Sequence, residues 1–382
     1  MNQRSANSVR LLIVVAFGVI SAAVIVRSGS AQNPTPGIAT QAVVAQKTVD
    51  EVRKNIQVLK GLPDSQLVPV MNYMSASLGV KCGFCHVNKD NNWDFASDEK
   101  GEKKTARVMI TMVTGVNKTT FNGNTEVSCY TCHRGRTSPV STPQLPIPEP
   151  SPRPEQGGQN QQAREALPAA DQILDKYIEA LGGSAAIEKL KSRTLKGTLT
   201  TANGASAGYE LSQSAPDMVL AVITTPQGTV QRGFDGTAGW EKSSRGVRDL
   251  GAPEVYYLRR YPNILRDIKL KDQFTRFNTA FKTRLNDRDV YVVRATAADR
   301  HREQLYFDVE TGLLVRRVTT LTTPVGNIPE EVDFEDYRDV GGVKMPFIVR
   351  VLSTDPNYSV VRKFTEIKIN PTLDPKVFDK PA

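Results

Sequence analysis

Two short motifs contain every cysteine of the chain and two of its three histidines: Cys82-Gly83-Phe84-Cys85-His86 and Cys129-Tyr130-Thr131-Cys132-His133. In C-x-x-C-H the two thiols can add across the vinyl groups of a haem, and the adjacent imidazole can bind the iron. A gap of two residues lets both sulfurs reach neighbouring vinyls, and a histidine directly after the second cysteine falls beneath the ring. The spacing therefore predicts two covalently bound haem c groups, attached at Cys82, Cys85, Cys129 and Cys132 with His86 and His133 as axial iron ligands.

Three other interpretations of the four thiols are open. A zinc site could use two C-x-x-C pairs, but it would give no role to the histidine after each pair. Two redox-active pairs would lack the βαβ pattern of thioredoxin-like proteins, and structural disulfides do not require a repeated histidine. Covalent haem attachment is the interpretation that uses all six residues.

The sixth iron ligand separates electron transfer from catalysis. A methionine thioether closes the iron and raises its potential, whereas an open site can bind peroxide or oxygen. Met71 and Met74 precede the first motif and Met109 and Met112 precede the second, each pair three residues apart on one helical face. Methionine also fills helix cores, so each pair offers one ligand and one packing residue. The remaining imidazole, His301, is expected at the surface.

Three helices are expected to position these side chains. Apolar residues recur at helical spacing in 49–59, 68–78 and 106–116. Pro69 suits the first turn of the second helix, and Gly79 suits its left-handed C-terminal stop.

The second half of the chain has a different pattern. From about Leu167 there is no cysteine, and apolar residues alternate with a period of two behind one helix at 169–181. Trp240 is expected in the core. Strand-like runs lie at 193–200, 218–224, 290–297, 304–308, 314–321 and 347–352. This pattern predicts a mostly antiparallel sheet with one leading helix.

The N-terminus predicts export. Arg4 and Arg10 precede an apolar run at 11–26, and small residues lead to Ala31, as in a secretory signal peptide over 1–31. The run has sixteen residues, fewer than the ~20 of a usual membrane-spanning helix. A periplasmic or exported protein is expected. An uncleaved segment would instead hold it at the outer face of the inner membrane.

A proline-rich segment divides the mature chain. Seven prolines between Thr137 and Glu155 precede a glutamine-rich run, which predicts a semi-rigid linker over 138–166. It separates 38–137 from 167–382. Since such a linker can hold the second part at a distance, cutting the chain there is expected to leave both haems and their potentials intact.

The first part resembles a known family, the bound multihaem cytochrome c subunit of photosynthetic reaction centres. The resemblance lies in 58–62, in Met71 through the first motif, in 105–112 and in 127–135. It covers about a quarter of the chain. It implies that Met71 binds the first iron and Met109 the second, and that Met74 and Met112 are packing residues.

Two departures from the family bear on the role. That subunit commonly carries four haems, and this chain matches one two-haem half. A histidine that serves the other half in the family has no counterpart in 118–126. The resemblance implies photosynthetic electron transport, whereas the departures favour a more general periplasmic electron carrier.

The second part resembles, more weakly, the half-open antiparallel barrels of outer-membrane lipoprotein-sorting and carrier proteins. The resemblance lies in 180–183, 306–315 and 336–346. It implies an apolar ligand within a concave sheet. The fold class expected is therefore multidomain, with a small mainly α c-type dihaem domain followed by an α+β domain with a curved antiparallel sheet.

Together these patterns predict an exported dihaem c-type cytochrome that transfers electrons and is not an enzyme. Its partner would be a redox protein, either a membrane-bound reaction centre or a respiratory complex. The formal charge of +9 favours docking to acidic partners, and because the basic residues are dispersed, nucleic acid is not expected. Two alternatives remain: a haem peroxidase-like enzyme, and a lipid or lipoprotein carrier with accessory haems.

Overall fold

The structure is a computed structural model that describes residues 47–90, 92–139, 166–251, 254–255, 258, 268–298, 301–354 and 359–381. All of them lie in one of the two units into which the chain divides, Ala45–Ala382. The predicted signal segment and most of the predicted linker lie outside the described residues. No helix in the described part of the chain has the length and apolar character needed to cross a membrane.

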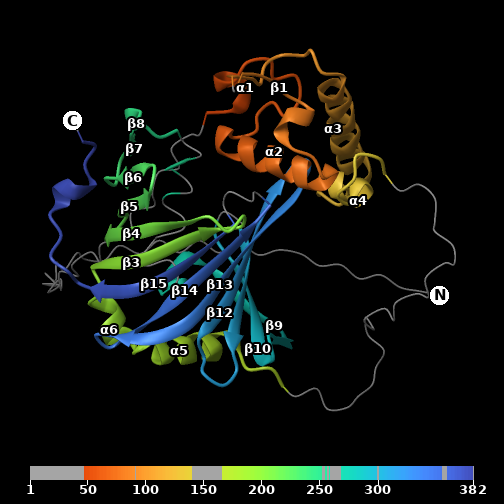
Figure 1. The fold of residues 1–382 in the computed structure, drawn as a ribbon. Helices are drawn as coiled ribbons and strands as arrows, with labels where there is room; N and C mark the ends of the chain where they lie inside the picture. Colours follow the sequence, from red (N-terminus) through yellow and green to blue (C-terminus); the bar gives the residue numbers. More distant parts are fainter. Residues whose placement is uncertain are drawn as a thin grey trace, which may run out of the picture. The chain divides into compact units, whose positions relative to one another are not determined.

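The first part is mainly helical and contains both motifs (Figure 1). A two-stranded antiparallel hairpin, β1 with β2, follows the first motif. The elements are α1 Val49–Val52, α2 Asp64–Leu78, the 3-10 helix η1 Cys82–Phe84, β1 Val87–Lys89, β2 Asn92–Asp94, α3 Gly101–Thr120 and α4 Cys129–His133.

Helix α2 ends where the sequence predicts and begins earlier than it predicts. Gly79 has φ 68° and ψ 31°, the left-handed conformation expected of the C-terminal stop. At the other end Asp64 receives two hydrogen bonds from Arg53, of 2.6 and 2.8 Å, and opens the helix. Pro69 therefore lies inside α2 and not in its first turn, so that expectation is wrong.

The first expected helix is reduced to one turn. It ends at Val52, because Arg53 is already extended, with φ −113° and ψ 155°. Further on, Asn55 and Leu59 have φ 58° and 62°, values outside a right-handed helix. The Asn55 side chain instead donates to the Ala96 carbonyl at 2.6 Å. Ile56 and Leu59 still pack against the core of this part, from irregular chain.

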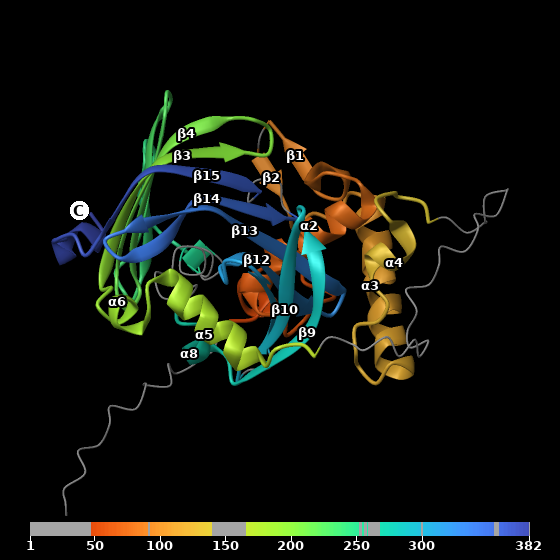
Figure 2. The same cartoon turned by 90° about the horizontal axis from the view of Figure 1, so that it is seen from below.

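The second part is a curved antiparallel sheet with short helices, as the sequence predicts. Figure 2 shows α5 lying across the sheet. The buried face of this helix consists of Ile173, Leu174, Tyr177 and Leu181. Trp240 is in the core, as predicted. The helices are α5 Ala170–Leu181, α6 Ser184–Glu188, α8 Leu270–Gln273 and the 3-10 helix η2 Pro375–Phe378.

Thirteen described strands form this sheet in the order β8-β7-β6-β5-β4-β3-β15-β14-β13-β12-β11-β10-β9. Strand β15, late in the chain, pairs with both β3 and β14. It thereby joins two runs of consecutive antiparallel strands, β3 to β8 and β9 to β14. The strands are β3 Ser192–Thr201, β4 Ser206–Ser214, β5 Met218–Thr225, β6 Gly228–Phe234, β7 Gly239–Ser243, β8 Gly246–Asp249, β9 Arg276–Leu285, β10 Arg288–Thr296, β11 Arg302–Asp308, β12 Leu314–Thr323, β13 Gly326–Val340, β14 Val343–Ser353 and β15 Val360–Ile369.

The turn between β12 and β13 is part of the core of the helical part. Val325 is fully buried and Ile328 is nearly so, both in one cluster with Val49, Val70 and Tyr73. This cluster connects the helical part with the start of β13 and the turn before it. Direct packing between residues far apart in the chain joins them.

Candidate functional site

Both motifs fold as a single helical turn. In the first, the amides of Cys85 and His86 donate to the carbonyl of Cys82 at 3.2 and 3.0 Å. The second is the short helix α4, which places Cys129, Cys132 and His133 at positions i, i+3 and i+4 on one face. Each turn thus presents two thiols and an imidazole on the same side.

The first motif opens onto a cavity of about 500 Å³. Met71 and Met74 of α2 line it together with Cys82, Cys85 and His86 of the motif. Pockets of roughly 300–1,000 Å³ hold cofactor-sized ligands, so this volume fits a haem. Both methionines are half-buried, and Met74 also packs against the core of the helical part.

The environment of the first motif suppresses charge on its ligands. Burial, aided by nearby Lys103, lowers the pKa of His86, which favours the neutral imidazole that binds metals. Burial likewise raises the pKa of the Cys85 thiol. The Phe95 ring packs edge-on against the His86 ring, with centroids 5.2 Å apart.

One wall of the cavity is fixed by charged side chains. Lys103 donates to the carbonyls of Phe95, Ala96 and Ser97 at 2.7–3.0 Å. Arg107 lies 2.8 Å from Asp98, whose pKa hydrogen bonds from Asn55, Arg107 and Lys103 lower to about 2. These two cations line the cavity, where they could pair with the propionates of a bound haem.

Two contacts order the second motif: an N-terminal cap on its helical turn and a contact between its histidine and a backbone carbonyl. Ser128 accepts from the Thr131 amide at 3.3 Å and starts the helical turn. Nδ1 of His133 lies 2.9 Å from the Arg136 carbonyl. When Nδ1 donates to a carbonyl, Nε2 is left as the metal-binding nitrogen, which is the usual arrangement in histidine metal sites. Burial raises the pKa of the Cys129 thiol.

Helix α3, which contacts α4, has an exposed apolar stripe. Met109, Met112 and Val116 are 40%, 50% and 37% exposed, and they follow one another at helical spacing. On the same helix Ile110 and Val113 are buried against the core. Such a contiguous apolar surface calls for a cover, and a haem attached to α4 would supply one.

Asn117 supports the second motif, although the sequence motifs do not predict this role. Its buried side chain donates to the Val127 carbonyl at 2.7 Å and accepts from the amides of Val127 and Glu126 at 2.9 and 3.2 Å. It thereby fixes the segment that leads into the second motif. An asparagine on a helix face that is otherwise apolar is the signal that could have identified it.

The two motifs approach each other through glycines. The Gly135 amide donates to the carbonyl of buried Ser77 at 2.8 Å. A Cβ on Gly79 would collide with the Gly135 carbonyl oxygen. Since Gly79 precedes the first motif and Gly135 follows the second, this backbone contact links the two sites.

We expect Gly79→Ala to lower the free energy of unfolding by at least about 2–3 kcal/mol, since left-handed strain adds to a backbone clash. Gly61→Ala is the matched control, because Gly61 has φ 77° but open space around its Cβ. It should cost only about 1 kcal/mol. Urea unfolding measures both values, and equal losses in the two variants would contradict the role of the contact.

Zinc binding and disulfide bonds are two of the other interpretations of the four thiols. None of the four cysteines pairs with another in a disulfide, and among the described residues no three His, Cys, Asp or Glu side chains gather as a metal site. His301, expected at the surface, is half-buried in the second part, with Nε2 3.2 Å from Oε1 of buried Glu303.

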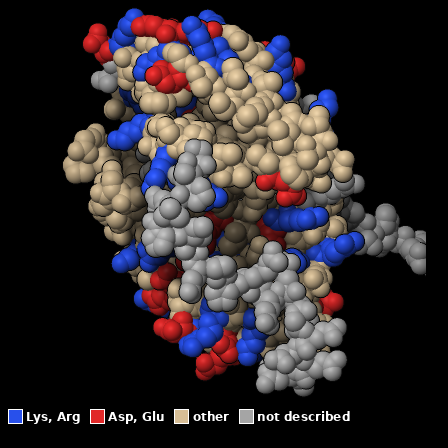
Figure 3. Space-filling model, turned by 90° about the vertical axis from the view of Figure 1, so that its right-hand side faces the viewer, with Lys and Arg blue, Asp and Glu red and all other residues tan. Residues whose placement is uncertain are grey.

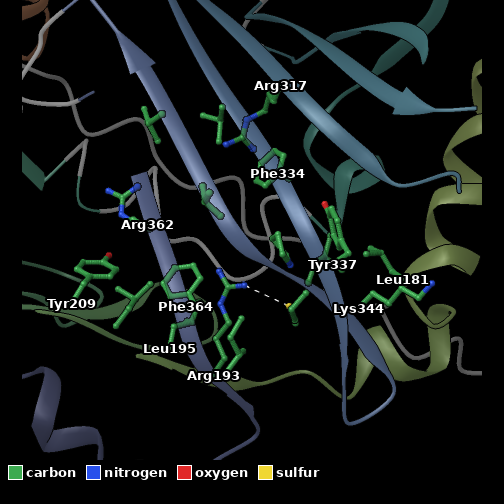
Figure 4. Close-up of a pocket in the computed structure, with 18 of the residues that line it drawn as sticks. Leu181, Arg193, Leu195, Tyr209, Arg317, Phe334, Tyr337, Lys344, Arg362 and Phe364 are labelled. Carbon is green, nitrogen blue, oxygen red and sulfur yellow. Dashed lines mark hydrogen bonds between the residues drawn. The ribbon is translucent and has the colours of Figure 1, made fainter. Parts of the chain in front are cut away.

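The sheet contains its own small pocket, of about 60 Å³ (Figure 4). Apolar walls such as Phe334 and Phe364 are joined by four basic side chains, Arg193, Arg317, Lys344 and Arg362. Arg193 contacts the Met345 sulfur at 3.8 Å. The pocket is smaller and more basic than the expected acyl-chain site, so the apolar ligand stays a prediction.

Comparison with known proteins bears on the first part. Residues 18–188 match the family model described as the photosynthetic reaction centre cytochrome C subunit. The resemblance predicted from the motifs is confirmed. Cytochrome c-554 of Chloroflexus aurantiacus is 41% identical over 86 residues, which are 21% of this chain and 20% of that protein. The reaction center cytochrome c subunit of Thermochromatium tepidum is 38% identical over 95 residues, 23% of this chain and 22% of that one.

The chain thus spans about a fifth of the length of these curated relatives. Solved structures similar to the second part include a LolA superfamily protein from Nitrosomonas europaea, 14% identical, covering 56% of this chain and 99% of that one, with a TM-score of 0.39. An outer membrane lipoprotein-sorting protein domain from Vibrio parahaemolyticus is 11% identical, covers 55% and 97%, and has a TM-score of 0.39. At such scores the likeness carries no argument about what this half binds.

Proposed function

We propose that the chain is an exported dihaem c-type cytochrome that transfers electrons and is not an enzyme. The observation that carries the proposal is the repeated arrangement of two thiols and an imidazole on one helical turn beside a methionine-bearing helix. Haem bound there would supply one-electron chemistry at iron.

In this proposal the chain's own residues hold and insulate the cofactor. Cys82, Cys85, Cys129 and Cys132 form the thioethers, and His86 and His133 bind iron from one side. Met71 and Met109 are proposed as the opposite ligands, and Met74 fits the packing role because it contacts the core. The proposed boundaries are 38–137 for the cytochrome, 138–166 for the linker and 167–382 for the curved sheet.

The proposed partner is a redox protein at the membrane, reached outside the cytoplasm after export. The formal charge of +9 favours a partner whose docking surface is acidic. On the face in Figure 3, Lys and Arg are interspersed with Asp and Glu and form no single basic stripe. This distribution suits a transient redox encounter better than nucleic-acid binding.

A redox titration of the purified exported chain, followed in the visible region, tests the proposal against the peroxidase-like alternative. We expect two one-electron transitions and only a slow change in the ferric spectrum on adding cyanide, because the methionine in the sixth position must first leave the iron. Rapid cyanide binding by either haem would favour an open, catalytic iron. Lipid that co-purifies with the chain would favour the carrier with accessory haems.

A further inference from the structure

A turn of the curved sheet contacts the second motif directly. The Cys129 amide donates to the Val325 carbonyl at 3.3 Å, and Thr125 Oγ1 donates to the Thr323 carbonyl at 3.1 Å. These contacts join the start of α4 to the turn between β12 and β13, about two hundred residues further along the chain.

The turn is built to be rigid. Thr323 is 3% exposed, and its hydroxyl donates to the Gly326 carbonyl at 2.7 Å across the turn. Val325, at the tip, is fully buried against the helical part. A buried tip closed by a hydrogen bond has little freedom to adjust, so the position of its carbonyl constrains the Cys129 backbone.

The approach of the turn to α2 is equally close. A Cβ on Gly326 would overlap the ring of Tyr73, which is only 7% exposed. Tyr73 belongs to the helix that carries Met71 and Met74. The absence of a side chain at 326 therefore lets β13 seat against the helical part.

We propose that the turn Thr323–Gly326 is a positioning element of the second haem site, so that the curved sheet helps to set that haem's potential. The inference rests on the proposed function. The turn touches no iron ligand; it acts by holding the backbone of Cys129 and by keeping water from that side of the motif. Loosening it admits water, which stabilises the ferric form and lowers the potential.

The test measures the second haem alone, in the full chain with Cys82→Ser and Cys85→Ser. In this background we expect Val325→Ala to shift the reduction equilibrium at least threefold toward ferric iron, about 28 mV at 59 mV per tenfold change. Exchange of the Cys129 amide with deuterium should also become at least tenfold faster. Gly326→Ala should have the same two effects through the displaced Tyr73 ring.

Val343→Ala is the matched control, since Val343 is 1% exposed and lies beyond the opposite end of β13. It removes the same atoms from the sheet's core. The reduction equilibrium of the second haem and the exchange rate of the Cys129 amide should therefore change by less than threefold relative to the parent. If Val325→Ala changes the potential of the second haem no more than Val343→Ala does, the inference is overturned while the proposed function stands. A parent chain without haem would overturn the proposed function instead, while Cys129 exchange would still test the contact.

Discussion

Replacing both Cys129 and Cys132 with serine is expected to remove one haem and to leave the other. Each motif folds as its own turn with its own pair of thiols, so loss of one pair does not disturb the other attachment. Intact-mass spectrometry should show two haem adducts on the parent chain and one on the variant. The pyridine haemochrome absorbance should fall by half.

The matched control exchanges the roles of the motifs. Cys82→Ser with Cys85→Ser should likewise leave one haem, now attached at α4. A parent chain with no haem adduct, or with bound zinc in its place, would refute covalent attachment at both sites. A double variant at α4 that still carries two haems would refute the assignment of the second motif.

Met71→His is expected to keep its haem and to lower that haem's potential. Imidazole stabilises ferric iron more than a thioether does, so a shift on the order of 100 mV is expected within the ~0.8 V that axial ligands span. A redox titration in the visible region measures the shift, and loss of the weak far-red absorption of thioether-bound ferric iron marks the exchanged ligand.

Met74→Leu is the control on the same helix. Met74 lines the cavity and also packs against the core, so a near-isosteric swap should cost under ~1.5 kcal/mol and leave the potential unchanged. If Met74→Leu removes the far-red absorption while Met71→His alters neither haem, the two methionines have the opposite roles.

Local chemistry made the attachment motifs readable from sequence. Two cysteines and a histidine within five residues need only one helical turn to lie on one face, whatever the rest of the chain does. Gly79 was predictable for the same reason, because the left-handed end of a helix depends on the residue itself. Alternation with a period of two predicted the strands of the sheet.

The prediction of the first helix was wrong because the apolar pattern in 49–59 indicates which residues are buried and does not determine their backbone conformation. Ile56 and Leu59 are packed against the core as a helix would place them, yet the chain there is irregular. Asn55 leaves the helical conformation to bond the Ala96 carbonyl, 41 residues away. Tertiary contact therefore overrides local propensity at the cavity wall.

The sequence by itself determined which residues can carry haem, since that chemistry lies within one turn. Only the tertiary structure decided what surrounds them. The cavity at Met71, the meeting of Gly79 with Gly135, and the seat of Val325 against Cys129 all join segments distant in the chain. Such contacts depend on the shape of both surfaces once folded, and no local pattern of residue types encodes that shape.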